Sequence, residues 1–176
     1  MLDRTLTVRV SRKQRLTADV TAFELVHPWG RTLPGYQAGA HIDVYLPGGF
    51  MRQYSLAQAE PTSAAAGPGC TRYVIGVKRE AAGRGGSASL HERVQEGDLL
   101  AISTPRNTFP LHPQAHHHLL LAGGIGLTPL LAMAQQLKRE GRPFTLCVFA
   151  RSRAHLAFAD ALAALGSDVR LHFDEV

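Results

Sequence analysis

The hydrophobic period of the chain changes once, near residue 105, and this change constrains the fold more than any other feature. Before it, short runs of alternating apolar and polar residues lie between turn-rich segments such as Pro47-Gly48-Gly49, a pattern typical of an antiparallel β-barrel. One helix is expected after Gly85-Gly86-Ser87, because Leu90 and Val94 are four residues apart. The predicted strands are Thr5 to Val10, Thr17 to Val26, Ala40 to Leu46, Arg52 to Leu56, Arg72 to Lys78 and Asp98 to Ser103.

After a linker rich in proline and histidine, Asn107 to Gln114, strands alternate with helices. The predicted strands are Leu119 to Ala122, Phe144 to Phe149 and Val169 to Phe173, and the predicted helices are Thr128 to Arg139 and Ala154 to Leu165. This order predicts a parallel sheet with right-handed crossovers, half of a doubly wound nucleotide-binding sheet. We therefore expect a barrel domain at 1–112 and a partial α/β domain at 113–176, in a chain that is a fragment.

Composition excludes several classes of protein. With 45% apolar and 19% charged residues, the chain has the composition of an ordinary globular protein. No apolar run approaches the roughly 18 residues of a membrane helix, and the first residues lack a signal-peptide core, so we expect a cytoplasmic protein without a membrane partner. The net charge of +5 is spread along the chain, which favours one or two phosphate sites over a nucleic-acid surface.

The first motif that could carry chemistry is Arg52-Gln53-Tyr54-Ser55-Leu56. An arginine, an aromatic ring and a hydroxyl so close together suit an anionic, planar ligand, because they supply charge, a stacking face and a hydrogen bond. A surface strand whose tyrosine packs on the barrel is the alternative.

The second motif, Gly83-Arg84-Gly85-Gly86-Ser87, leads directly into the predicted helix. Glycines let backbone amides approach an anion, and a helix N-terminus adds unpaired donors and a positive dipole end. A flexible turn with a serine cap would look similar. Lys78, Arg79 and Arg84 beside it favour a phosphate site.

The third motif runs from Ala122 to Pro129 and contains Gly123, Gly124 and Gly126 between a buried strand and a helix. Dinucleotide sites require this context, although Pro129 stands where the usual fingerprint has its third glycine. Three glycines in four residues exceed the need of a simple turn. The sequence therefore predicts a variant dinucleotide-binding turn.

Two other groupings carry no site. His116, His117 and His118 are consecutive at a strand entry, so they cannot all face one ion; we expect them to be solvent-exposed and expect no metal site. Ser87, Ser89 and His91 lack the elbow motif of a hydrolase nucleophile.

Taken in order, the three motifs resemble the ferredoxin-NADP reductase superfamily, most closely its phthalate dioxygenase reductase branch. Val77-Lys78-Arg79 and Pro105 to Leu111 are also similar to that branch, and the likeness covers almost the whole chain. The resemblance implies an FMN-binding barrel and an NAD(P)H-binding domain. In this branch a plant-type [2Fe-2S] ferredoxin domain follows, which we expect in the missing C-terminal part of the same polypeptide.

Site residues follow from the resemblance. Ser55 would lie beside flavin nitrogen N5, and Thr128 would lie where flavin and nicotinamide meet, so both are implied catalytic positions. The implied flavin-binding residues are Arg52, Gln53, Tyr54, Ser55, Gly76, Val77, Lys78, Gly85, Gly86, Ser87 and Thr128. The expected dinucleotide-binding residues are Gly123, Gly124, Ile125, Gly126, Arg151, Ser152 and Arg153.

The implied function is electron transfer from NADH or NADPH through FMN to an iron-sulfur centre that serves a Rieske oxygenase or a cytochrome P450. FMN is favoured over FAD because the loop from Ala57 to Thr71 offers no aromatic shelf for adenine. Arg151 and Arg153 leave a 2'-phosphate, and hence NADPH, open. The alternatives are an FAD-dependent ferredoxin reductase-like enzyme and a flavin-free binding module with a basic docking surface.

Overall fold

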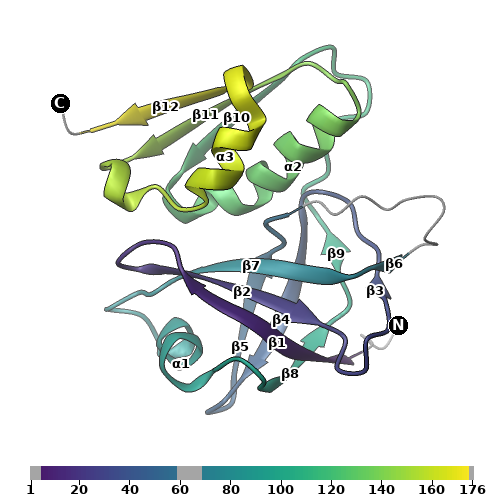
Figure 1. Ribbon diagram of the computed structural model, residues 1–176, viewed down its shortest axis with the longest axis vertical. Coiled ribbons are helices and arrows are strands. Elements are labelled where there is room, and N and C mark those ends of the chain that lie inside the picture. The colour runs from purple at the N-terminus through teal and green to yellow at the C-terminus, as the bar shows by residue number, and fades with distance from the viewer. Residues whose placement is uncertain (1–4, 59–68, 175–176) are drawn as a thin grey trace.

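The computed structural model describes residues 5–58 and 69–174, which form a β-barrel and a parallel sheet with helices (Figure 1). The two helices of the parallel-sheet part, at 127–139 and 159–165, lie between that sheet and the barrel, so the sheet forms the outer layer. This arrangement confirms the predicted fold class.

The barrel contains most of the strands in the described part of the chain. Its path runs β5-β4-β8-β1-β2-β7, with β9 paired to β4, and a single bridge between Leu56 and Ile75 brings the two edges together. The barrel is therefore nearly closed. The bounds are β1 Thr5–Arg15, β2 Val20–Val26, β4 Ala40–Leu46, β5 Phe50–Ser55, β7 Arg72–Lys78, β8 Leu99–Ser103 and β9 Arg106–Asn107, beside a separate pair of β3 Leu33–Pro34 and β6 Gly69–Cys70.

Alternation of apolar residues builds the barrel core, as strands with one buried face require. Helix α1, Gly86–Arg93, closes one end with Leu90 and the adjoining Val94, both almost fully buried. Strand β1 runs past the predicted end at Val10 because its register shifts between Val10 and Arg12, which is the signature of a bulge. Strand β2 begins at Val20 because the Thr17 hydroxyl accepts the Val20 amide at 3.0 Å and shapes a turn.

The second layer contains three parallel strands in the order β10-β11-β12. Their bounds are β10 His118–Gly123, β11 Phe144–Ala150 and β12 Val169–Phe173, and the helices are α2 Leu127–Arg139 and α3 Ala159–Leu165. Short 3-10 turns η1 Gly124–Gly126, η2 Arg153–His155 and η3 Gly166–Asp168 connect them. One apolar cluster joins α2 and α3 to barrel residues Val20, Ala38, Ala57 and Val74, so the two layers share a core.

Two expectations in this layer are wrong. The predicted helix from Ala154 to Leu165 begins only at Ala159, because Phe158 has a left-handed backbone, with φ 57°, which a continuous right-handed helix excludes. Of the three histidines expected to be exposed, His118 is buried, and its Nε2 lies 3.2 Å from the carbonyl oxygen of His112. The linker folds back to cover it.

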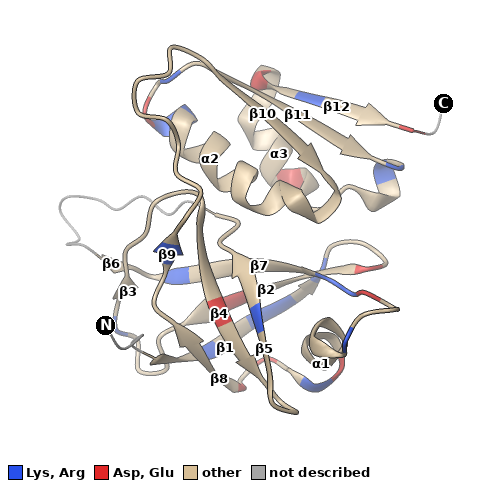
Figure 2. Cartoon of the chain, turned by 180° about the vertical axis from the view of Figure 1, so that it is seen from behind, with Lys and Arg blue, Asp and Glu red and all other residues tan. Residues whose placement is uncertain are grey.

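The outer face of the parallel sheet carries Leu119, Leu121 and Phe149, all well exposed. Basic and acidic residues are interspersed over both layers of the described chain (Figure 2). None of the helices described has the length and apolar character of a membrane span.

Candidate functional site

The predicted motifs meet at a cavity of about 420 Å³ between the barrel and the parallel-sheet layer. We call it the first cavity. Its described wall comes from β5, β7, the segment leading into α1, and the η1–α2 junction. The lining residues are Arg52, Gln53, Tyr54, Ser55, Gly76, Lys78, Glu80, Gly83, Arg84, Gly86, Ser87, Ile125, Gly126, Thr128 and Pro129.

One end of the first cavity combines an arginine with the start of α1. Arg52 lies so close to this start that a Cβ at Gly86 would come within 2.7 Å of Arg52 Nε. The guanidinium donates to the carbonyl oxygen of Met51 at 2.8 Å and reaches that of Arg84 at 3.4 Å. Since the first amides of a helix have no intrahelical acceptor, they and Arg52 form a set of donors that fits a phosphate.

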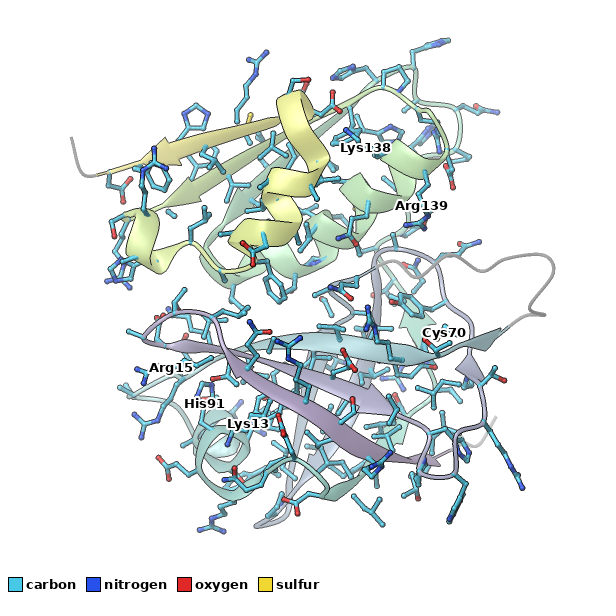
Figure 3. All side chains as sticks on the ribbon, in the orientation of Figure 1. Lys13, Arg15, Cys70, His91, Lys138 and Arg139 are labelled. Atoms are coloured by element: carbon cyan, nitrogen blue, oxygen red, sulfur yellow. The ribbon has the colours of Figure 1, made fainter. Side chains whose placement is uncertain are left out.

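The helix that supplies these amides is anchored at its other end. Lys13 Nζ donates to the carbonyl oxygens of His91 and Val94, at 2.8 and 2.7 Å, and Lys13 and His91 lie together beside α1 in Figure 3. Ser87 Oγ accepts the amide of Glu80 at 3.1 Å, which closes the loop before the helix. The Ser87 hydroxyl hydrogen can therefore donate into the cavity.

Tyr54 and Ser55 form the wall that follows Arg52. Burial raises the pKa of Tyr54 to about 12, against a smaller lowering by Arg52, so the phenol is neutral at neutral pH. A neutral, half-buried ring offers an apolar face with one polar tip, which suits contact with a flat aromatic ligand. Ser55 adds a hydroxyl on the adjacent strand position.

Gly76 on β7 lets the two layers approach closely. A Cβ there would come within 2.9 Å of Thr128 Cγ2 and of Phe158 Cε2. Thr128 Oγ1 donates to the carbonyl oxygen of Ile125 at 3.1 Å, so its hydroxyl hydrogen is used within the η1–α2 turn. Thr128 therefore presents its methyl group to β7, and only hydroxyl lone pairs remain for a ligand.

Two residues expected at the flavin do not line this cavity. The Val77 side chain is buried in the barrel core, and Gly85 precedes α1 with a φ of 83° next to the Phe50 ring. Glu80, Gly83, Arg84 and Pro129 also line it. They were not among the residues expected to bind flavin, although Arg84 was expected beside the phosphate site. Gly83 and Arg84 belong to the second motif, whereas Glu80 had no local signal.

A second cavity of about 300 Å³ opens at the carboxyl ends of the parallel strands. Of the residues expected to bind a dinucleotide, it contains Gly124, Ile125 and Arg151, while Gly123, Gly126, Ser152 and Arg153 lie outside its wall. Arg153 instead lies over the Phe173 ring, 5.3 Å from its centroid, and Ser152 pairs with His155 Nδ1 at 2.8 Å. The remaining wall, which sequence reasoning did not assign to a dinucleotide, consists of Asp19, Val20, Lys78, Phe149, Ala150, His155, Ala157 and Asp174.

The two cavities are adjacent, because Lys78 and Ile125 line both. Lys78 Nζ pairs with Glu80 at 3.3 Å, so a partly neutralised cation lies at the junction. A planar group in the first cavity and a second ligand in the other could therefore make direct contact.

A barrel whose cavity opens towards the glycine-rich turn of a parallel sheet defines the ferredoxin reductase-like class of protein. The crystal structure of phthalate dioxygenase reductase, described as modular for electron transfer from pyridine nucleotides to [2Fe-2S], matches 97% of this chain and 52% of its own, with a TM-score of 0.90 at 42% identity. An intact type IV self-sufficient cytochrome P450 monooxygenase matches 97% of this chain and 21% of its own, with a TM-score of 0.87 at 36% identity.

Sequence comparison agrees with the structures. The phthalate dioxygenase reductase of Burkholderia cepacia is 42% identical over 172 residues, which cover 96% of this chain and 51% of that protein. The chain belongs to the phthalate dioxygenase reductase-like branch of the ferredoxin-NADP reductase superfamily, as its motifs predicted. It spans about half the length of these relatives, and no family model matches it.

Proposed function

We propose that this chain is the flavin-binding and part of the dinucleotide-binding portion of an electron-transfer reductase. Electrons would pass from NADH or NADPH through FMN to an iron-sulfur centre, and from there to an oxygenase. The observation that carries the proposal is the shared wall of the two cavities, formed by Lys78 and Ile125. Hydride transfer requires the two reacting rings to be in contact, and a shared wall permits this.

The barrel at 1–112 would hold FMN, which supplies the conversion between two-electron and one-electron transfer. Arg52 and the amides at Gly86 and Ser87 would bind its phosphate, with Gly85 allowing the turn. Tyr54 would cover the ring and Ser55 would donate a hydrogen bond near its reactive edge, with Gln53, Gly76 and Lys78 forming the rest of the wall. The Val77 side chain is buried in the barrel core, so only its backbone could contribute. No acid or base residue is needed, because orientation is what the protein contributes.

FMN fits better than FAD because Arg52 and the start of α1 together suit a terminal, doubly charged phosphate. The other argument, the lack of an aromatic shelf between Ala57 and Thr71, falls largely on residues 59–68, which lie outside the described residues.

The part at 113–176 would bind the dinucleotide. Gly123, Gly124, Ile125 and Gly126 form the turn that backbone contacts to a pyrophosphate require, and Thr128 lies at the junction with the flavin cavity. Arg151, Ser152 and Arg153 follow β11, where the adenosine ribose is held in doubly wound sheets. Both NADH and NADPH remain donors in this proposal, since Arg151 shares its wall with Asp19 and Asp174.

The proposed partners are a ferredoxin domain in the same polypeptide and an oxygenase acceptor in the cytoplasm. Support comes from the relatives, one of which is a dioxygenase reductase and another an intact P450 monooxygenase. Both a Rieske oxygenase and a P450 therefore fit as acceptors.

The test is a visible spectrum of the purified chain, release of the flavin by heat, and chromatography, followed by anaerobic titration with NADH and NADPH. We expect a yellow protein, a predominant FMN peak, and slow bleaching by one of the two dinucleotides, because the three parallel strands form only half of a doubly wound sheet. A colourless protein that takes up no flavin would support the binding-module alternative, and a predominant FAD peak would support the FAD-dependent one. Bleaching by dithionite but by neither dinucleotide would refute the dinucleotide half of the proposal.

A further inference from the structure

Phe158 stands out from every other residue that the structure describes. It is the one non-glycine residue there with a positive φ, 57°, and its side chain is only 8% exposed. A left-handed backbone is unfavourable for a non-glycine residue, and such strain persists where surrounding contacts impose it. The contacts of the Phe158 ring therefore identify what the strain maintains.

The ring packs against β7 of the barrel. A Cβ at Gly76 would come within 2.9 Å of Phe158 Cε2 and 3.0 Å of Phe158 Cζ, so only glycine admits the ring at this position. The same hypothetical atom would come within 2.9 Å of Thr128 Cγ2. Gly76 thus receives two side chains of the parallel-sheet layer, Phe158 from the start of α3 and Thr128 from α2.

The position of this contact relates it to both cavities. Gly76 and Thr128 line the first cavity, and Ala157, which directly precedes Phe158, lines the second. The left-handed turn at Phe158 lets the chain leave the wall of the second cavity and direct a ring onto the wall of the first. A shift of this ring would change the distance between the wall of the first cavity at Gly76 and the wall of the second cavity at Ala157.

We infer that Phe158 is a positioning residue whose ring, packed on Gly76, sets the separation at which dinucleotide and flavin meet. This inference rests on the proposed function. The ring touches neither ligand. Because misplacement of reacting groups by about 1 Å can cost 10²-fold in rate, loss of the ring would slow hydride transfer much more than it weakens flavin binding.

The experiment uses the FMN-loaded chain and four variants. Phe158→Ala removes the ring, Phe158→Leu keeps apolar bulk, and Phe158→Gly removes both the ring and the backbone strain. Leu165→Ala is the matched control, because Leu165 is buried at the opposite end of the same helix. For each, the limiting rate of flavin bleaching, the half-saturating dinucleotide concentration, the FMN dissociation constant and the unfolding midpoint are measured.

We expect Phe158→Ala and Phe158→Gly to lower the limiting rate about tenfold or more, with the FMN dissociation constant within about twofold of wild type. Phe158→Gly should be the more stable of the two, and Phe158→Leu should recover most of the rate. Leu165→Ala should lose stability and keep its rate. A wild-type rate in Phe158→Ala, or an equal loss of rate in Leu165→Ala, would overturn the inference.

A second measurement needs neither flavin nor dinucleotide. Hydrogen exchange of residues 72–78 should be faster in Phe158→Ala than in wild type and unchanged in Leu165→Ala. If the wild-type chain is not bleached by NADH or NADPH, the proposed function fails, and this exchange measurement still decides whether the ring fixes β7. Unchanged exchange in Phe158→Ala would then reject the contact.

Discussion

At the scale of single residues, the end of the first cavity beside α1 is shaped by the absence of one side chain as well as by the presence of another. Arg52 can lie over the start of α1 only because Gly86 has no Cβ, which would come within 2.7 Å of its Nε. The guanidinium is oriented by the backbone carbonyls of Met51 and Arg84. An anion there would meet a cation that is already positioned.

Replacing Arg52 with alanine should weaken FMN binding, because it removes a charge-assisted phosphate contact worth roughly 1.5–3 kcal/mol, or about 10- to 150-fold in the dissociation constant. Flavin fluorescence titration measures the change. Arg9→Ala, at an exposed position on β1 of the same barrel, is the control and should bind FMN as wild type does. Equal affinities for all three proteins would remove Arg52 from the site.

The raised pKa of Tyr54 predicts how the free energy of unfolding falls at alkaline pH. Its pKa is raised to about 12 by burial, whereas an unfolded chain would titrate near the ordinary value of 10. The unfolded state therefore loses its proton first, and the stabilisation present below pH 10 is lost as the pH rises towards 12. Between pH 9 and about pH 11, Tyr54→Phe should lose less unfolding free energy than wild type in urea titrations. Burial also raises the pKa of Tyr73. Because wild type and Tyr54→Phe both keep Tyr73, its contribution to the alkaline loss of stability should be the same in the two proteins.

At the scale of elements, the turn between β10 and α2 leaves its glycines facing open space. A Cβ at Gly123 or Gly126 would meet no atom within 4 Å, and neither residue has a positive φ. The fold therefore does not require glycine at either position. A ligand that approached the backbone closely would require glycine there.

Gly126→Ala should therefore keep the unfolding free energy of wild type, or raise it slightly, while weakening NAD(P)H binding and slowing flavin bleaching by about tenfold or more. Urea denaturation and anaerobic stopped-flow measurements give the two quantities. Gly123→Ala, outside the wall of both cavities, is the comparison and should have the smaller effect. Normal kinetics in Gly126→Ala would argue that no dinucleotide contacts this turn.

Elements with a strong local pattern were predictable. The strands at Ala40–Leu46, Arg72–Lys78 and Val169–Phe173 have the bounds expected from alternation and flanking turns. The start of the helix expected from Ala154 was wrong, because Phe158 has a left-handed backbone and its ring packs on Gly76 of β7. A contact with a distant strand cannot be predicted from the local sequence pattern. Several of the residues that line the two cavities lie within motifs that the sequence shows, whereas no motif pointed to Asp19 or Glu80, which line the cavities because the chain folds them there.

At the scale of the whole molecule, the linker between the layers is fastened to the barrel where it begins. Arg106 Nη2 lies 2.5 Å from Asp43 Oδ2, and the Asp43 side chain is only 7% exposed. Further along, the side-chain amide of Asn107 donates to the carbonyl oxygen of Ala38 at 3.0 Å. The backbone amide of Ala38 in turn donates to the side-chain oxygen Oε1 of Gln136 on α2, also at 3.0 Å. The linker, the barrel and α2 therefore contact one another at one place.

Replacing Arg106 with methionine should lower the unfolding free energy by about 3 kcal/mol, because it leaves the Asp43 carboxylate buried without its cation. Arg79→Met is the matched control: its ion pair with Glu92 is nearly as short, 2.6 Å, but both side chains are about half exposed. That variant should lose much less stability than Arg106→Met, because solvent screens an exposed ion pair. Equal losses in urea denaturation would mean that burial does not decide the strength of these pairs.

The wall shared by the two cavities has a consequence for binding equilibria. Since Lys78 and Ile125 line both, a ligand in one cavity changes the surroundings offered to the other. Thermodynamic linkage then requires reciprocity: the factor by which FMN changes dinucleotide affinity must equal the factor by which dinucleotide changes FMN affinity. Calorimetric titration of each ligand with and without the other would give the same coupling free energy twice. Lys78→Met alters the common wall, so it should change the effect of FMN on dinucleotide affinity and the effect of dinucleotide on FMN affinity by the same factor.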